Sequence, residues 1–218
     1  MRTVIAGGHG KIALILERML SARGDDVAGL IRNPGQVAEV EAAGADALVV
    51  DLEKASIDEV ARHLAGADAV VFAAGAGPGS GAARKDTVDR DAAILLADAA
   101  EAAGVQRYVM VSAMGSDPRA TADDEVFEVY LRAKGVADEA IRSRSALQWT
   151  IVRPGALTND AGTGSVAVAE STGRGSIPRE DVAAVLVAVL DEPRTAGRAF
   201  DLISGDTPIT EAVAALTR

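Results

Sequence analysis

The chain has 218 residues, no cysteine and a formal net charge of −10. Its length suits one domain with a substantial core, and the lack of cysteine excludes disulfides and thiolate metal sites, as expected for a cytoplasmic protein. The negative charge argues against nucleic acid and anionic membranes as partners. We expect no membrane span, because the longest apolar runs fall short of roughly 20 residues, and no secretory leader, because the N-terminal apolar stretch ends in glycines.

Apolar strands and amphipathic helices alternate along the chain. Strands are predicted at 3–6, 26–31, 46–50, 67–73, 105–112 and 147–152. Helices are predicted from residue 12 to about residue 20, and at 34–43, 56–64, 86–103 and 123–145. Such strands, apolar nearly throughout, indicate an α/β fold with a doubly wound parallel sheet covered on both faces. A binding crevice is then expected at the carboxyl ends of the strands.

The first strand ends in a glycine-rich turn. Gly7, Gly8 and Gly10 lie within four residues, and the helical pattern begins directly after them. A turn of this kind leaves free backbone N–H groups at the positive end of a helix, where a pyrophosphate can bind. The spacings Gly8-x-Gly10-x-x-Ala13 and Gly7-x-x-Gly10-x-x-Ala13 both match a dinucleotide-binding turn. The alternative is a plain strand-to-helix connection.

Residues after the next strands suggest which dinucleotide binds. Arg32 follows the second strand, where proteins that bind NAD usually carry an acid. Arg32 and Lys11 together favour NADP(H) over NAD(H), because both could bind a 2′-phosphate; the alternative is that both are solvated surface charges. Asp51 and Leu52 end the third strand, where Asp51 either accepts a hydrogen bond from adenine or caps the next turn. Small residues end the fourth strand and leave room for the nicotinamide ribose, namely Ala73, Ala74 and Gly75. The loop 75–84 either closes over the cofactor or is simply flexible.

The helix at 123–145 carries Tyr130 and Lys134, which are four residues apart and therefore on one face. Ser112 ends the neighbouring fifth strand. A free tyrosine needs on the order of 4 kcal/mol to ionise readily at pH 7, and an ammonium about 4 Å away supplies roughly that amount. We therefore expect Lys134 to acidify Tyr130, which donates a proton to a substrate carbonyl that Ser112 orients. The alternative is a surface tyrosine packed on a lysine stem.

The glycine turn, Ser112, the Tyr130–Lys134 pair and the stretch 147–155 together resemble the short-chain dehydrogenase/reductase superfamily. The chain resembles most its atypical NAD(P)H-binding branch, which includes the biliverdin reductase B and NmrA relatives. The resemblance implies a catalytic set of Ser112, Tyr130 and Lys134. It implies that the cofactor-binding residues are Gly7, Gly8, His9, Gly10, Lys11, Ile12, Arg32, Asp51, Leu52, Ala73, Ala74, Gly75, Lys134 and Pro154. His9 and Pro178 depart from the commoner residues of the branch, and some of its members bind cofactor but catalyse little.

The tail is expected to build the substrate side of a single domain, with residues 155–178 as an insertion. Within the tail, strands are predicted at 165–168 and 199–203 and a helix at 179–190. Only 64 residues follow Pro154, which favours a small substrate. The two histidines, His9 and His63, lack metal-ligand spacing, so no metal site is expected. The sequence predicts an NADP(H)-dependent reductase of a small carbonyl, quinone or flavin-like compound, monomeric or a small homo-oligomer. An NADP(H) sensor and a nucleotide-sugar epimerase or dehydratase are the alternatives.

Overall fold

The computed structural model describes residues 1–77, 79–81 and 83–217. The strands of its main sheet are β1 (Arg2–Ala6), β2 (Asp26–Ile31), β3 (Asp46–Val49), β4 (Ala69–Phe72), β5 (Arg107–Val111), β6 (Gln148–Pro154), β8 (Ser165–Ala169), β10 (Arg198–Ser204) and β11 (Thr207–Pro208). They are ordered β11-β8-β10-β6-β5-β4-β1-β2-β3. The strands from β3 to β10 in this order are parallel, and β8 pairs antiparallel with both β10 and β11. The predicted doubly wound α/β fold is therefore confirmed.

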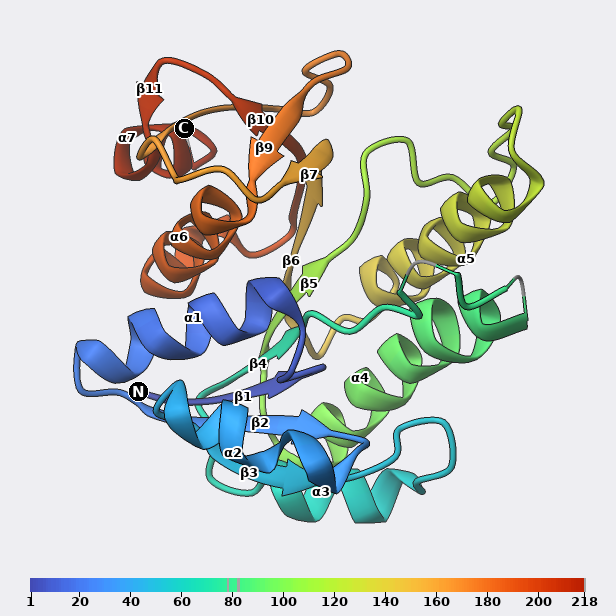
Figure 1. Cartoon of the computed structure of the whole chain (residues 1–218), viewed down its shortest axis with the longest axis vertical. Helices are drawn as coiled ribbons and strands as arrows, with labels where there is room; N and C mark the ends of the chain where they lie inside the picture. The colour runs from blue at the N-terminus through green and yellow to red at the C-terminus, as the bar shows by residue number, and fades with distance from the viewer. Residues whose placement is uncertain (78, 82, 218) are drawn as a thin grey trace.

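Helices cover both faces of this sheet. They are α1 (Lys11–Ala22), α2 (Val37–Ala42), α3 (Ile57–Leu64), α4 (Ala92–Ala103), α5 (Glu125–Arg142), α6 (Arg179–Asp191) and α7 (Ile209–Ala215). In Figure 1, α1 and α6 lie on one side of the sheet, and α4 and α5 lie on the other. Two short strands, β7 (Ala156–Thr158) and β9 (Ser176–Pro178), form a separate parallel pair.

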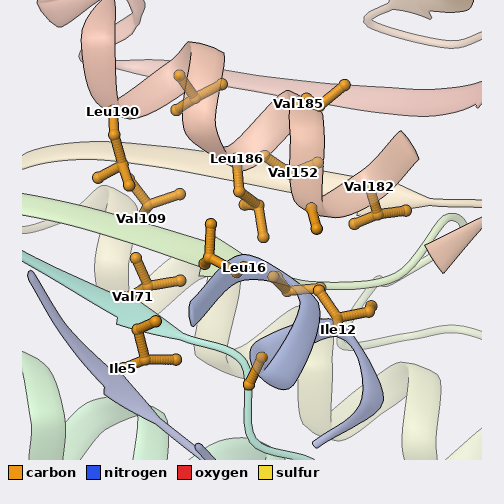
Figure 2. Packing of buried hydrophobic residues seen from close by; sticks show 14 of the residues in the cluster. Ile5, Ile12, Leu16, Val71, Val109, Val152, Val182, Val185, Leu186 and Leu190 are labelled. Carbon is orange, nitrogen blue, oxygen red and sulfur yellow. The ribbon is translucent and has the colours of Figure 1, made fainter. Parts of the chain in front are cut away.

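Side chains of each central strand alternate between the two faces. In β1, Ile5 packs into the core under α1 and α6, and its neighbour Val4 packs into the core on the opposite face. Figure 2 shows the first of these cores, where Leu16 of α1 and Leu186 of α6 meet over the strands. Because both faces are buried, the strands read as continuous apolar runs in the sequence.

The strand order reverses between β1 and β4, and the glycine turn lies at this point. Gly7 has a φ of +80°, and a Cβ there would lie 2.6 Å from the Cα of Ala74. Only glycine therefore lets the turn approach the end of β4. The reversal opens a crevice at the carboxyl ends of the strands, as predicted for this fold.

Several details differ from the sequence prediction. The helix expected at 86–103 starts as a π-helix, η2 (Lys85–Asp91), before it continues as α4. Strand β6 extends to Pro154, because that residue pairs with Leu202 of the neighbouring strand β10. The sequence did not predict the short strands β7, β9 and β11 or the helix α7. Among the described residues, no helix is both long and apolar enough to cross a membrane.

Candidate active site

Two adjoining cavities occupy the crevice. The glycine-turn cavity, of about 320 Å³, runs from Gly7 past the ends of β2 and β3 to Arg32 and Asp51. The Tyr130 cavity, of about 600 Å³, extends from the start of α1 to α5. Both are lined by Gly10, Ala73, Ala74 and Gly75. A long molecule can therefore lie across the shared wall and reach both ends.

The start of α1 forms the shared corner of the two cavities. Its N-cap residue, Gly10, has an extended backbone, and no side chain caps the free N–H groups of the first turn. A Cβ at Gly10 would lie 3.0 Å from the carbonyl oxygen of Gly7, so a side chain there would crowd the turn. Uncapped N–H groups at a helix N-terminus bind anions. The glycine turn thus fits the pyrophosphate of a dinucleotide.

Most of the predicted cofactor residues line these cavities. The glycine-turn cavity is lined by Gly7, His9, Gly10, Arg32, Asp51, Leu52, Ala73, Ala74 and Gly75. The Tyr130 cavity holds Lys11, Ile12, Ser112, Tyr130 and Lys134. Gly8 and Pro154 line neither cavity. Lys11 lies in the Tyr130 cavity, so the structure does not bring it beside Arg32 as the sequence predicted.

At the far end of the glycine-turn cavity, two arginines share one carboxylate. Glu53 accepts hydrogen bonds from Arg32 at 2.7 Å and from Arg84 at 2.9 Å, both through Oε2. Thr87 donates to its other oxygen at 2.7 Å. The hydrogen bond from Arg84 is the largest cause that lowers the pKa of Glu53. The arginines therefore already bind an anionic group at this position, and Glu53 and Arg84 were missed from the sequence because 31 residues separate them.

Asp51 caps the turn that follows it, which is one of the two roles predicted for it. Its Oδ1 accepts a hydrogen bond from the N–H of Glu53 at 3.2 Å, and its Oδ2 lies 3.1 Å from Nζ of Lys54. Asp51 also lines the glycine-turn cavity, so its expected hydrogen bond to adenine stays a prediction.

Lys134 is buried in the wall of the Tyr130 cavity. Its ammonium lies 3.4 Å from Oδ1 of Asp89, and it donates hydrogen bonds to the carbonyl oxygens of Val111 at 3.2 Å and Ala74 at 3.4 Å. Asp89 is 0 % exposed, and its other oxygen accepts from the N–H of Ala76 at 3.2 Å. The positive charge of Lys134 is therefore balanced by a carboxylate that the sequence reasoning did not identify.

The expected acidification of Tyr130 by Lys134 is wrong for this structure. Burial raises the pKa of Tyr130, and the carboxylates of Asp89 and Asp138 raise it further. The physical reason is that Asp89 neutralises Lys134, while the phenol loses solvent that would stabilise its anion. Tyr130 is thus held as a neutral phenol at physiological pH.

Ser112 follows β5 and is nearly buried. Its hydroxyl lies 3.4 Å from the hydroxyl of Ser116, which donates to Asp138 at 2.9 Å. Arg153 of β6 donates to the same oxygen of Asp138 through Nε at 2.8 Å. Ser112 therefore sits at the end of a buried polar network, where it faces the Tyr130 cavity.

The π-helix η2 supplies Lys85 and Asp89, which both line the Tyr130 cavity. The ammonium of Lys85 lies 5.3 Å from the centre of the Tyr130 ring and donates to the carbonyl oxygen of Gly77 at 3.0 Å. Their spacing of four residues was a readable signal for a shared face. Part of the preceding loop, residues 78 and 82, lies outside the described residues, so its expected closure stays a prediction.

The fold and the crevice define a Rossmann-type dinucleotide-binding protein. Residues 7–193 match the model of the NAD(P)H-binding family, and the chain belongs to this family. The match confirms the resemblance to NAD(P)H-binding proteins and is consistent with an atypical short-chain dehydrogenase/reductase. Reductases and epimerase-like proteins both occur among its structural neighbours.

Similar proteins cover nearly the whole chain. It is 40 % identical over 214 residues to an uncharacterized sugar epimerase, YhfK, of Bacillus subtilis. The matched region covers 98 % of this chain and 99 % of YhfK. A solved structure of a putative NAD-dependent epimerase/dehydratase from Bacillus halodurans has a TM-score of 0.90 and 39 % identity, and covers 99 % of both chains. The solved structure of the oxidoreductase ylbE from Lactococcus lactis has a TM-score of 0.88 and 27 % identity. The match covers 99 % of this chain and 96 % of ylbE.

Proposed function

We propose that the protein is an NADP(H)-dependent oxidoreductase that reduces a small carbonyl, quinone or flavin-like compound. One observation carries the proposal: Ser112, Tyr130 and Lys134 line a single cavity that continues into the glycine turn. The family membership supports a nicotinamide cofactor. The substrate would then bind against Tyr130, on the far side of the nicotinamide from the adenosine half.

When bound, NADPH supplies the hydride. Tyr130 is a neutral phenol, which is the form that donates a proton to a substrate oxygen as the hydride reaches the substrate. Lys134 donates hydrogen bonds to two carbonyl oxygens, so the third N–H of its ammonium could serve a hydroxyl of the nicotinamide ribose. Ser112 orients the substrate oxygen toward the phenol.

Arg32 and Arg84 support the preference for NADP(H). Both contact one carboxylate at the end of the cavity where the adenosine ribose of a dinucleotide lies in this fold. A 2′-phosphate would replace Glu53 as their anionic partner, because arginine binds phosphate through paired hydrogen bonds. NAD(H), without that phosphate, would leave the pairs with Glu53 intact.

The names of two similar proteins favour a second candidate, an epimerase or dehydratase. Such an enzyme would use the same phenol and cofactor but return the hydride to its substrate. The two functions differ in a measurable way, because only the reductase consumes NADPH.

The test is a panel of carbonyls, quinones and nucleotide sugars, with NADPH oxidation and product formation both followed. The panel is run with the wild type, Tyr130→Phe, and Tyr108→Phe as a control for the other tyrosine, whose hydroxyl donates to the carbonyl of Ala93. A reductase is expected to lose at least a hundredfold in kcat in Tyr130→Phe only. Tight NADPH binding without turnover would instead identify a sensor, and sugar conversion without NADPH loss would identify an epimerase.

A further inference from the structure

The Tyr130 cavity has an exposed apolar wall. Seven large apolar side chains are exposed among the described residues, and three of them line this cavity: Val126 at 43 %, Phe127 at 49 % and Leu157 at 39 %. Single exposed apolar side chains are ordinary, but their convergence on one cavity is typical of a ligand site. The wall therefore suits an apolar molecule.

Part of this wall is aromatic. The rings of Phe127 and Tyr130, one turn apart on α5, are stacked on each other, with centres 5.9 Å apart and an angle of 28° between their planes. The ammonium of Lys85 lies 5.3 Å from the centre of the Tyr130 ring. Neighbouring groups therefore already contact the Tyr130 ring, and the exposed Phe127 ring supplies aromatic surface to the apolar wall.

The same cavity carries an excess of positive charge, although the chain as a whole is acidic. Among the described residues, its lining includes the cations Lys11, Lys85, Lys134 and Arg179, but only two carboxylates, Asp89 and Asp124. Asp89 pairs with Lys134, and Asp124 caps α5 by accepting from the N–H of Phe127 at 2.7 Å. Within the described part of the chain, the other three cations form no ion pair. This imbalance favours an anionic ligand.

Arg179 is the cation best placed for a substrate. It follows β9 directly, and its Nη1 donates to the carbonyl of Thr158 at 3.0 Å and to Oδ1 of Asn159 at 2.8 Å. Its other nitrogens, Nη2 and Nε, donate to no acceptor in the described residues. Lys11 begins α1, where a dinucleotide pyrophosphate would lie, and Lys85 already donates to the carbonyl of Gly77. Arg179 lines the Tyr130 cavity but not the glycine-turn cavity.

We propose that the substrate is an apolar compound that carries a carboxylate or phosphate group, and that Arg179 binds this group. The inference rests on the proposed reductase function, since it assigns the substrate class of the same cavity. The apolar wall of Val126, Phe127 and Leu157 contacts the body of the substrate, and the anchored guanidinium presents its free N–H groups to the acid. A charged hydrogen bond of this kind is worth about 1.5–3 kcal/mol, or at least about tenfold in affinity.

The test compares two matched probe pairs on the full chain saturated with NADP⁺. FMN and riboflavin differ in a phosphate, and 2-naphthoate and 2-naphthamide differ in a carboxylate; binding of each is followed by fluorescence. The variants are Arg179→Met, Arg179→Lys, and Arg62→Met as a control at an exposed arginine of α3. We expect an acidic probe to bind at least about tenfold more tightly than its neutral partner. We expect Arg179→Met to remove this difference without weakening the neutral probe, and Arg179→Lys to restore part of it.

Three results would overturn the inference: equal binding of acidic and neutral probes, no binding of either acidic probe, or a selectivity that Arg179→Met leaves intact. Weaker binding of NADP⁺ to Arg179→Met, with probe selectivity unchanged, would assign the arginine to the cofactor instead. Which pair shows the selectivity distinguishes phosphate from carboxylate. Acid-selective binding without reduction by NADPH would support this inference and contradict the reductase proposal. Equal reduction of FMN and riboflavin by NADPH would support the reductase proposal and contradict this inference.

Discussion

The ammonium of Lys134 lies 3.4 Å from the carboxylate of Asp89, and both groups are buried beside Tyr130. The pair fixes Lys134 in the wall of the cavity but also removes the net positive charge that would acidify the phenol. The pKa of Tyr130 therefore depends on Asp89 as well as on Lys134.

Asp89→Asn is expected to destabilise the protein and lower the pKa of Tyr130. Removal of the carboxylate leaves the Lys134 ammonium buried without a counter-charge, which costs about 3 kcal/mol of unfolding free energy. Because Asp89 raises the pKa of Tyr130, the alkaline limb of the pH–rate profile should move to lower pH. Urea unfolding and tyrosinate absorbance measure the two effects. Asp86→Asn, at a half-exposed position of the same π-helix, is the control and should change neither. An unchanged Tyr130 titration in Asp89→Asn would contradict the coupling.

Arg32→Ala is expected to weaken NADP(H) binding by about tenfold or more, because a charged hydrogen bond to the 2′-phosphate is lost. Arg84→Ala should act in the same direction, and Glu53→Gln should strengthen NADP(H) binding, since it removes a competing negative charge. NAD(H) affinity should change little in Arg32→Ala and Arg84→Ala. Calorimetric titration with both cofactors measures these changes, with Arg62→Ala as the control. Tighter binding of NAD(H) by the wild type, together with unchanged NADP(H) affinity in Arg32→Ala, would refute the preference.

Gly7→Ala is expected to abolish dinucleotide binding and to lower stability by several kcal/mol. A Cβ at this position would meet the backbone of Ala74 at 2.6 Å, in addition to the strain of a positive φ. Gly66→Ala separates the two effects, because Gly66 has a φ of +75° but, apart from its chain neighbours, no described residue lies within 4 Å of the added Cβ. That variant should lose only about 1 kcal/mol, the cost of the left-handed backbone. Thermal unfolding with and without NADPH measures both variants, and equal losses would show that the contact with Ala74 is unimportant.

Glu17 of α1 is a fully buried carboxyl under the glycine turn. Neither of its oxygens has a hydrogen-bond partner among the described residues, and burial raises its pKa to about 8 from the usual 4.5. Its Oε1 would lie 2.9 Å from a Cβ at Gly8 and 2.6 Å from a Cβ at Gly29. The two glycines thus leave the space that the carboxyl fills.

The titration of Glu17 makes stability depend on pH. Between about pH 4.5 and 8, the folded protein keeps a proton that the unfolded chain has released, so this contribution to stability is lost as pH rises through that window. The loss is at most about 5 kcal/mol. Glu17→Gln should flatten the pH dependence and stabilise the protein at pH 8, whereas Glu41→Gln, at an exposed position of α2, should do neither. Urea unfolding at several pH values measures this, and parallel curves for wild type and Glu17→Gln would contradict it.

The local pattern determined most of the fold. Unbroken apolar runs predicted parallel strands because both faces of this sheet are buried, as Val4 and Ile5 illustrate. The glycine turn was predictable because only glycine tolerates the backbone of Gly7 beside Ala74. The short strands β7 and β9 were not predictable, since a strand of three residues carries no periodicity.

By itself the sequence determined the sheet, the glycine turn and the shared face of Tyr130 and Lys134, because each depends on neighbours within a few residues along the chain. Only the tertiary structure decided the charges around them. It brought Asp89 to Lys134 across 45 residues, and Arg84 to Glu53 across 31. It also brought Arg179 to the wall that holds Phe127. Electrostatic interactions depend on distance in space and on burial, and neither is encoded in local spacing.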